Sequence, residues 1–377
     1  MTFSLDARQA QRATILGLAC GMLALSACQT RAPIRPLPGE LDRTLAAKQQ
    51  VAVIVPLTGE DGPIGTSISN AAKLALLDSG NQRIALNIYD SNQGGAAAVA
   101  ARAIAEGNRL ILGPLLAEEV RAAAPIARRA RVPIIAFSND ESVAGQGVYI
   151  LGFTPRQSIG RVVDFARARG ARRFGALVPT GVYGQIAIEA LQATLRASSG
   201  ALVVESYGRS LAGVRTAANS LNGKGNFDAI LIADASRIAG QAAGALRPGA
   251  RLLGTELWAN DRRMGANARL RGAWFAAAPD ARFDQLVTRY RARYGKTPYR
   301  LGSLGYDSVL LTVRAARAWQ PGRPFPQRVL TEREGFAGVD GIFRFGRDGV
   351  AERALEVREV TANGTRVVSS APAAFPG

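Results

Sequence analysis

The chain has no histidine among its 377 residues and only two cysteines, Cys20 and Cys28. Without histidine, the Ser-His-Asp and Cys-His nucleophile systems are excluded, and the commonest metal ligand is missing. Removal of a signal peptide ending at residue 27 would leave Cys28 as the only cysteine, so neither a disulfide nor a thiolate metal site could form. We therefore expect no metal and no other cofactor.

Sequence motifs of common enzymes are also missing. The segment GEDGPIG (59–65) has no lysine and carries acidic residues where a phosphate would sit. No GxGxxG follows an expected strand, no GxSxG elbow occurs, and SNAAK (69–73) is one residue too long for an SxxK pair. The paired carboxylates Glu118 and Glu119 fit an exposed helix face better than an active site. We expect a protein that is not an enzyme.

The N-terminus carries the features of a processing signal. Arginines precede the apolar run ATILGLACGMLALSA (13–27), whose fifteen residues are too short to span a bilayer but suit a signal peptide. Residues 25–28, LSAC, resemble the bacterial lipobox, in which the cysteine is lipidated and the chain is cut before it. Gln29 stands where an inner-membrane retention signal would have Asp. We expect 1–27 to be a lipoprotein signal peptide and Cys28 the lipid anchor of an outer-membrane protein facing the periplasm.

An ordinary signal peptide, cut nearby and leaving Cys28 as a free thiol, is the alternative. The charge balance fits a periplasmic protein with anionic neighbours, because 47 Lys and Arg face only 29 Asp and Glu, a net charge of +18. That location argues against nucleic acid and favours lipopolysaccharide phosphates, peptidoglycan carboxylates or an acidic protein face. GC-rich coding would account for the charge equally well, because nearly all basic residues are arginine and alanine and glycine are abundant.

Residues 28–50 are expected to form a proline-rich tether, and from 51 onward short apolar runs alternate with alanine-rich helical patterns. The runs expected to form strands are 51–56, 84–90, 109–114, 132–138, 174–179, 201–207, 228–234, 251–257 and 273–279. Apolar strands with little alternation, each followed by a helix, indicate parallel sheets covered on both faces. The length exceeds one comfortable core, so two α/β domains are expected.

Three segments are expected to cross between these domains, near residues 150, 276 and 337. The expected fold class is α/β, with two parallel-sheet doubly wound lobes joined by the three crossings. The expected boundaries are 51–150 plus 277–336 for the first lobe, 151–276 plus 337–365 for the second lobe, and 366–377 for a tail.

Nine short motifs, in order along residues 51–365, carry a family resemblance. They include VPLTG, LILGP, VPIIAFS, VPTGVYG, FDAILIAD, LLGTELW, LGYDSV and DGIFRFGRDG. Together they resemble the type I periplasmic-binding-protein fold of the leucine-binding-protein-like group. With its lipobox, the chain looks like the penicillin-binding-protein activator lipoproteins of that group. The larger activators also carry an N-terminal helical-repeat domain, and here only the tether precedes the first lobe.

The resemblance implies a non-catalytic lipoprotein that binds and activates a penicillin-binding protein, a peptidoglycan synthase. Peptidoglycan or an unknown small ligand is a further candidate for the cleft between the lobes, and the membrane is contacted through the lipid anchor. The alternative is a solute receptor of an ABC transporter for branched-chain or other amino acids.

Ligands of open α/β sheets bind at the carboxyl ends of the strands, where strand order reverses. By the resemblance, the first lobe offers Thr58, Leu115, Leu116, Ser138, Asn139 and Asp140. The second part of the set is Tyr183, Asp234, Ser236, Glu256 and Tyr306. Ser138 could bind an amino-acid carboxylate, and Asp234 or Glu256 its ammonium. Alternatively, these residues only end strands and cap helices.

One departure from the family pattern argues against a free amino acid. Leu115 and Leu116 follow Gly113-Pro114, where amino-acid-binding members place a serine-like residue. Leucine side chains cannot hydrogen-bond a carboxylate, although backbone N–H groups can. We expect VPLTGEDGPIG (55–65) to line the cleft, which would hold no tightly bound free amino acid.

Overall fold

The computed structural model describes residues 48–196, 201–208, 210–261 and 263–375. The expected signal peptide, Cys28 and nearly all of the expected tether lie outside these residues. Residues 46–377 form one compact unit, which contains two sheets with separate cores. No helix among the described residues is long and apolar enough to cross a membrane.

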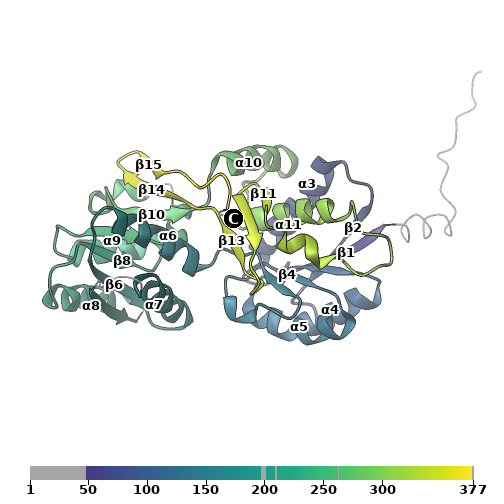
Figure 1. The fold of residues 1–377 in the computed structure, drawn as a ribbon, viewed down its shortest axis with the longest axis horizontal. Helices are drawn as coiled ribbons and strands as arrows, with labels where there is room; N and C mark the ends of the chain where they lie inside the picture. The colour runs from purple at the N-terminus through teal and green to yellow at the C-terminus, as the bar shows by residue number, and fades with distance from the viewer. Residues whose placement is uncertain (1–47, 197–200, 209, 262, 376–377) are drawn as a thin grey trace, which may run out of the picture. The chain divides into compact units, whose positions relative to one another are not determined.

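The first lobe is built on a five-stranded parallel sheet with the order β2-β1-β3-β4-β5. Its strands are β1 (Gln49–Val55), β2 (Ile84–Asp90), β3 (Leu110–Leu112), β4 (Ile134–Ala136) and β5 (Val148–Ile150). The helices that follow them are α3 (Gly62–Ser79), α4 (Ala96–Ala105), α5 (Ala117–Ala130) and the short η1 (Glu141–Val143). The sheet is parallel, as the unbroken apolar runs predicted. In Figure 1 its strands β1, β2 and β4 are labelled.

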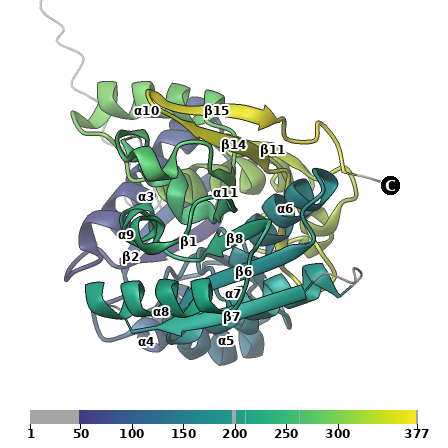
Figure 2. The same cartoon turned by 90° about the vertical axis from the view of Figure 1, so that its left-hand side faces the viewer.

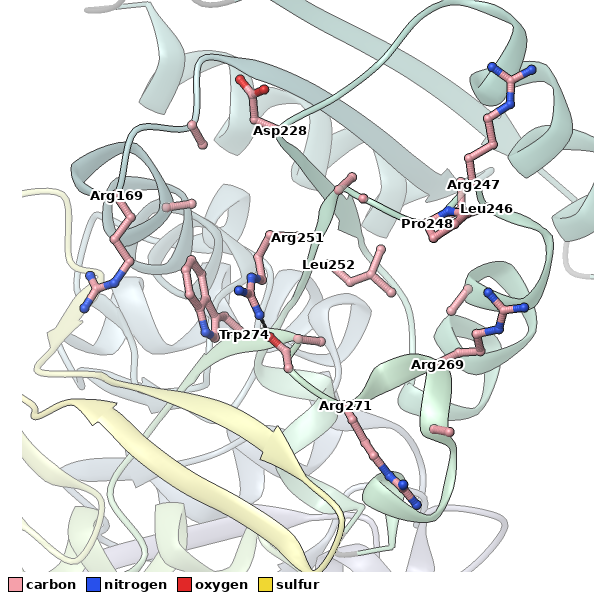
Figure 3. A pocket seen from close by; sticks show the side chains of 18 of the residues that line it. Arg169, Asp228, Leu246, Arg247, Pro248, Arg251, Leu252, Arg269, Arg271 and Trp274 are labelled. Carbon is pink, nitrogen blue, oxygen red and sulfur yellow. Dashed lines mark hydrogen bonds between the residues drawn. The ribbon is translucent and has the colours of Figure 1, made fainter.

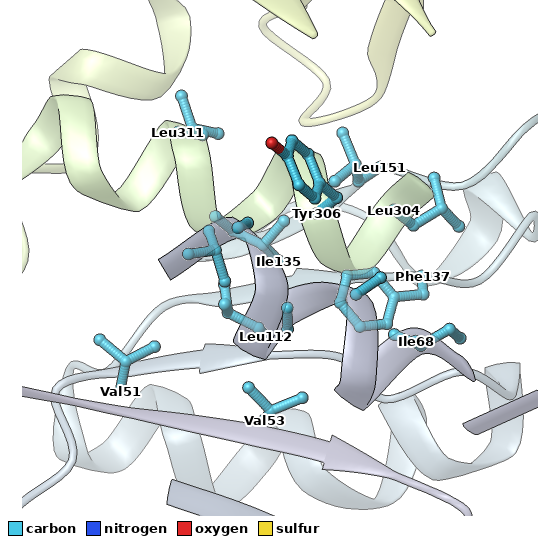
Figure 4. Packing of buried hydrophobic residues seen from close by; sticks show 14 of the residues in the cluster. Val51, Val53, Ile68, Leu112, Ile135, Phe137, Leu151, Leu304, Tyr306 and Leu311 are labelled. Carbon is cyan, nitrogen blue, oxygen red and sulfur yellow. The ribbon is translucent and has the colours of Figure 1, made fainter. Parts of the chain in front are cut away.

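Alternate residues of β1 enter two different cores. Val51 and Val53 pack with α3 and with a helix from far along the chain, α11 (Gly302–Ala315), whereas Ala52 and Ile54 pack with α4 and α5. Figure 4 shows the first of these cores, with Leu304 of α11 above the strand residues. The period of two along a strand thus places one row of side chains under each helical layer.

The second lobe has a seven-stranded sheet with the order β15-β14-β10-β9-β8-β6-β7. Its strands are β6 (Arg173–Pro179), β7 (Ala201–Tyr207), β8 (Ala229–Ile232), β9 (Arg251–Gly254), β10 (Trp274–Ala277), β14 (Glu356–Thr361) and β15 (Gly364–Ser369). The first five are parallel and repeat the strand order of the first lobe, and β14 and β15 add an antiparallel edge. In Figure 2, β7 and β15 lie at opposite ends of this sheet.

Helices cover both faces of this sheet too. Those of the second lobe are α6 (Pro155–Ala168), α7 (Val182–Leu195), α8 (Leu211–Gly223) and α9 (Ser236–Ala245), with short turns η2 (Glu256–Asn260), η3 (Met264–Ala266) and η4 (Ala268–Leu270). Helices α6 and α7 pack on one face, and α8 and α9 on the other. The predicted architecture of two doubly wound lobes is confirmed.

The third predicted crossing is misplaced. A small antiparallel sheet of β11 (Phe336–Gly338), β12 (Gly341–Phe345) and β13 (Ala351–Arg353) follows α10 (Ala281–Tyr294), α11 and η5 (Gln327–Thr331). Its residues Val339, Phe343, Phe345 and Ala351 are buried in the core of the first lobe. The chain therefore crosses to the second lobe between β13 and β14, not near residue 337.

The other boundaries differ less. Strand β5 ends at Ile150 and α6 begins at Pro155 in the second lobe, close to the first predicted crossing. Strand β10 ends at Ala277 and α10 begins at Ala281 in the first lobe, close to the second. Strand β15 runs to Ser369, so residues 366–369 belong to the sheet of the second lobe and not to a tail.

Candidate functional site

A cavity of about 310 Å³ lies between the two lobes. We call it the inter-lobe cavity, and it is lined by Asp61, Ile64, Leu115, Leu116, Phe137, Asn139, Phe153, Glu256, Leu257, Ala259, Ala277, Ala278, Arg300 and Leu301. Its first-lobe wall comes from the segments after β1, β3, β4 and β5, as the strand-end rule predicts. A cavity of this volume is at the lower end of the range for small-molecule sites.

Four of the predicted site residues line this cavity: Leu115, Leu116, Asn139 and Glu256. Of the opening segment 55–65, Asp61 and Ile64 reach it. Most of the remaining wall is apolar, so the cavity offers a small number of polar groups in an apolar surrounding. This is the usual composition of a site for a small organic molecule.

The second-lobe wall is displaced from the point where strand order reverses. Strand order reverses between β6 and β8, but the wall is made by the segment after β9 and by the end of β10. Tyr183 follows β6 and Asp234 follows β8, so neither of these predicted residues lines the cavity. Tyr183 contacts the wall indirectly, because its hydroxyl is hydrogen-bonded to Thr255 and Glu256, which follow β9.

Glu256 is the acidic group of the second-lobe wall, and its carboxylate is already hydrogen-bonded. The Tyr183 hydroxyl donates to Oε1 over 3.1 Å, and the Ser158 hydroxyl donates to Oε2. Burial raises the pKa of the Glu256 carboxyl above its usual value, although both hydrogen bonds favour its charged form. Burial and Glu256 together raise the pKa of Tyr183. The pair therefore forms a fixed polar unit facing an apolar cavity.

The donors of the opening loop are occupied by Asp90, at the end of β2. Its carboxylate accepts the Leu57 N–H over 2.9 Å, the Thr58 hydroxyl over 2.8 Å and the Asn92 N–H over 3.1 Å. Burial acts to raise the pKa of Asp90, but these hydrogen bonds outweigh it and hold the pKa below its usual value. The predicted ligand residue Thr58 thus binds a carboxylate of the chain itself.

A second carboxylate occupies the start of α5. Glu119 is buried, and its Oε2 accepts the backbone N–H of Leu116 over 3.1 Å. The Leu116 N–H could have bound a ligand carboxylate in place of a serine hydroxyl, but it already donates to Glu119. The expectation that Glu118 and Glu119 share an exposed helix face holds for Glu118 and is wrong for Glu119.

The predicted residues Ser138 and Asp140 stabilise their own loop. The Ser138 Oγ accepts the Asp140 N–H over 3.1 Å, and Asp140 accepts the Ser142 N–H over 2.9 Å at the start of η1. Asp140 also pairs with Arg121 over 2.5 Å. Neither side chain lines the inter-lobe cavity.

Asp234 and Ser236 have comparable structural contacts in the second lobe. The Tyr207 hydroxyl donates to Asp234 over 3.0 Å, and the Ser236 hydroxyl donates to Asp261 over 2.7 Å. Both residues therefore fit the alternative from the sequence, that the predicted ligand residues only end strands and cap helices.

The prediction that Tyr306 binds a ligand is wrong, because Tyr306 lies in the core of the first lobe. It is 4% exposed, and its hydroxyl donates to Asp78 on α3 over 2.8 Å. Figure 4 places its ring among Leu151, Leu304 and Ile135. Burial and the Asp78 carboxylate raise the pKa of Tyr306.

Arg300 is the cationic residue of the cavity wall, and no sequence pattern pointed to it. Its guanidinium donates to Asp280 over 2.8 Å and to Asp340 over 2.6 Å, and it stacks 4.1 Å from the centroid of the Phe283 ring. It precedes α11 rather than following a strand, so the strand-end rule misses it. Both of its carboxylate partners belong to the chain, as at Asp90 and Glu119.

Behind Arg300 lies a buried group of charges made by Asp307, Asp340 and Arg353. Arg353 donates to the Leu151 carbonyl over 2.5 Å, and Asp307 accepts the Val339 N–H over 2.8 Å. Within the described part of the chain, one oxygen of each aspartate and two nitrogens of Arg353 have no hydrogen-bond partner. Burial first, and then the Asp340 carboxylate, raise the pKa of Asp307 to about 7.

Metal binding finds no support in the described ranges, where no three His, Cys, Asp or Glu side chains gather in a way that could hold an ion. The inter-lobe cavity thus combines apolar walls with a few polar groups, of which Glu256 and Arg300 already have partners in the chain. Such an arrangement can bind an apolar or neutral group, whereas an added anion would have to compete with Asp280 and Asp340 for Arg300.

A family model described as "Periplasmic binding protein" matches residues 48–365. The match covers most of the chain, and the chain belongs to this family. The family indicates a periplasmic location, as expected from the N-terminal sequence, whereas lipidation at Cys28 stays a prediction.

Solved structures that are similar to this chain include a leucine-binding protein and LpoA. A leucine-binding protein, LivK, from Thermotoga maritima is 21% identical with a TM-score of 0.65, covering 86% of this chain and 98% of that one. Full-length LpoA from Haemophilus influenzae is 17% identical with a TM-score of 0.66, covering 86% of this chain and 59% of that one. Identities this low show the fold alone, and they confirm the predicted type I, leucine-binding-protein-like fold.

Among curated proteins, "Uncharacterized protein RP748" from Rickettsia prowazekii (strain Madrid E) is 25% identical over 176 residues. The match covers 45% of this chain and 45% of that protein. The chain thus spans less than half the length of this relative.

Proposed function

We propose that this chain is a non-catalytic lipoprotein of the outer membrane, facing the periplasm, that regulates peptidoglycan synthesis by binding and activating a penicillin-binding protein. The observation that carries the proposal is that carboxylates of the chain occupy several donors in the segments at and next to the inter-lobe cavity. Asp90 holds the donors after β1, Glu119 holds the N–H before α5, and Glu256 holds Tyr183 and Ser158. The cavity then does not serve a free amino acid, and the protein acts through contacts with another protein.

The energetic argument concerns the carboxylate of a bound amino acid. To enter, it must displace one of these side chains or stay without its full set of hydrogen bonds. Burying a charged group without partners costs several kcal/mol, and each ~1.4 kcal/mol weakens binding tenfold. A micromolar receptor, with ~8 kcal/mol of binding free energy, could not absorb that loss.

The proposed partner rests on two further observations. The lipobox-like sequence LSAC supports a lipid anchor at Cys28, and the proline-rich sequence that follows would then link this anchor to the lobes. The lobes share their fold with LpoA. Peptidoglycan or an unknown uncharged molecule is the proposed occupant of the cavity.

A solute receptor is the second candidate, and the apolar wall of the cavity favours it. Leu115, Phe137 and Phe153 could hold an aliphatic or aromatic side chain, and Glu256 could accept an ammonium group. The solved LivK structure is that of a leucine-binding protein. For this function Asn139 and Arg300 would have to bind the ligand carboxylate. Arg300 would then have to give up its contact with Asp280 or Asp340.

Crosslinking in intact cells, followed by affinity capture of the tagged lipoprotein, tests the first proposal. We expect recovery of a penicillin-binding protein from both the wild type and a Glu256→Gln variant, because the cavity is not the proposed protein contact. A Cys28→Ala form, released from the membrane, should capture much less. Recovery of a transporter permease and no synthase would overturn the proposal.

Isothermal calorimetry against the common amino acids tests the cavity. We expect no micromolar binding. A micromolar ligand whose affinity is lost in Glu256→Gln, and kept in the control Glu205→Gln, would establish the receptor function instead. Glu205 is a suitable control because it lies on β7, outside the inter-lobe cavity, and pairs with Lys224.

A further inference from the structure

A second cavity, of about 580 Å³, opens on the second lobe at the amino ends of its parallel strands. Asp228 precedes β8, and Arg251 and Trp274 are the first residues of β9 and β10. All three line this cavity, whereas the inter-lobe cavity meets the opposite ends of β9 and β10. The two cavities are therefore separate, and binding in one leaves the other open.

Five exposed arginines line this second cavity, and we call it the arginine pocket. They are Arg169, Arg247, Arg251, Arg269 and Arg271 (Figure 3). Asp228 is the carboxylate of the lining. It is engaged elsewhere, because it accepts the backbone N–H groups of Arg172 and Arg173 over 2.8 Å and pairs with the Arg173 side chain.

The positive charge of the pocket is not neutralised within the described ranges. None of the five guanidinium groups has a described carboxylate within 4.0 Å, although several other exposed arginines of this chain do form such pairs. Glu359 interacts with Arg251 at longer range, but its ion-pair partner is Arg366. The concentration of unpaired cations around one concave surface favours an anionic ligand.

Part of the pocket is held in place before any ligand binds. The Arg251 guanidinium lies 4.4 Å from the centroid of the Trp274 ring, and Arg169 lies 3.5 Å from that of Phe165. Arg271 donates from Nε to the Gly265 carbonyl over 3.0 Å. Figure 3 shows Arg251 beside Trp274, with the other arginines around the rim. Side chains already fixed by such contacts lose less conformational entropy on binding.

Helix dipoles and an arginine-rich composition account for only part of this arrangement. Arg169 is the residue after the end of α6, and Arg247 is the second residue after the end of α9. A cation at the carboxyl end of a helix interacts favourably with the helix dipole. Arg251, Arg269 and Arg271 do not stand at the end of an α-helix, so this account does not apply to them. An arginine-rich composition accounts for many arginines, but not for their gathering without acidic partners in one cavity.

We infer that the arginine pocket binds a multiply phosphorylated anion. Guanidinium groups present paired N–H donors that match phosphate oxygens, and several of them around one cavity can neutralise several negative charges. Such an anion has two sources: a free polyphosphate, or the phosphorylated head groups of a membrane surface. The inference is independent of the proposed partner and of the inter-lobe cavity.

Two probes distinguish these sources with the purified full chain. Tripolyphosphate, followed by calorimetry and by tryptophan fluorescence, represents a free anion. Sedimentation with vesicles of phosphatidylglycerol and phosphatidylcholine represents a membrane surface. We expect saturable binding of at least one probe at low salt, weakening as the ionic strength rises.

The test variant is Arg169→Gln/Arg247→Gln/Arg269→Gln, which leaves the hydrogen-bonded Arg251 and Arg271 in place. It should bind the effective probe at least tenfold more weakly than the wild type and show a shallower salt dependence. In the wild type, binding of tripolyphosphate should change the fluorescence of Trp274. A Trp274→Phe variant should lose that signal and keep calorimetric binding, which locates the site even if the triple variant folds poorly.

The matched control is Arg128→Gln/Arg129→Gln/Arg215→Gln. These three residues are exposed and lie outside the pocket, and their replacement removes the same net charge. We expect near wild-type affinity from it. Equal losses in the two triple variants would reduce the effect to net charge and overturn the inference. So would failure of both probes to bind the wild type at low salt.

Discussion

Replacing Asp307 with asparagine should remove a large part of the pH dependence of folding stability. Asp307 is fully buried on α11 and faces Asp340, and its pKa is raised to about 7 from the usual 3.8 by burial and then by that carboxylate. The opposing charge is Arg353, whose guanidinium is itself incompletely hydrogen-bonded within the described residues. The folded protein therefore holds the Asp307 proton more tightly than the unfolded chain does.

The sign of the effect follows from this difference. The stabilisation is fully present below the unfolded pKa of 3.8 and is lost as the pH rises towards about 7. At pH 5 the folded state keeps the proton and the unfolded state does not, and near pH 7 about half of the folded molecules have lost it. The free energy of unfolding therefore falls by up to ~1.4 kcal/mol per pH unit, with a shallower slope near pH 7, or roughly 2 kcal/mol between pH 5 and pH 7. This is a large share of the ~5–15 kcal/mol that typically stabilises a protein.

Urea unfolding of the wild type and of Asp307→Asn at pH 5, 6 and 7 measures the effect. We expect the stability of the wild type, relative to the variant, to fall by about 2 kcal/mol across this range, because only the wild type carries the titrating group. Glu118→Gln removes an exposed carboxylate and should keep the pH dependence of the wild type. If Asp307→Asn keeps the wild-type slope as well, the assignment of a raised pKa to Asp307 is refuted.

Three further predictions test the anchor, the core and the opening loop. Cys28→Ala should move the protein from the outer-membrane fraction to the soluble periplasm, and a variant that still sediments with membranes would rule out lipidation as the anchor. Tyr306→Phe should lower the free energy of unfolding by ~1 kcal/mol, measured by urea unfolding, because Asp78 loses a hydrogen bond. Gly65→Ala should lower the thermal midpoint by several degrees, because the new Cβ would lie 1.7 Å from the Pro56 carbonyl oxygen; an unchanged midpoint would contradict this close packing.

The sequence predicted the strands of both sheets, but it assigned the segment that forms β11, β12 and β13 to the wrong lobe. Every apolar run expected to form a strand contains one, because the central runs such as β1 and β8 are buried throughout or nearly so, and the apolar residues of a run can be recognised without knowing its distant partner. The strands around Phe343 and Phe345 are different. Their alternating pattern predicts a hairpin, but which lobe covers the buried face is decided by packing against α11 and its neighbours, and the pattern does not contain that information.

The site was predicted in part, for a related reason. Leu115 and Asn139 follow strands whose ends meet the cavity, so the strand-end rule finds them. The rule fails for Asp234, since the second lobe presents the segment after β9 rather than its switch point. It cannot find Arg300, which precedes a helix, and it cannot show that a residue such as Asp90 already fills the donors of a neighbouring loop.

The covering of the first lobe by α11 also determines how long the core of that lobe stays open during synthesis. A chain that emerges from its N-terminus presents β1 to β5 with α3, α4 and α5 first, but the core around Val51 and Val53 stays open until residues 302–315 arrive. The five parallel strands of the second lobe and their four helices all emerge before that point. The apolar face of the first lobe therefore stays uncovered while these elements of the second lobe emerge, and it must be shielded from other chains until α11 arrives.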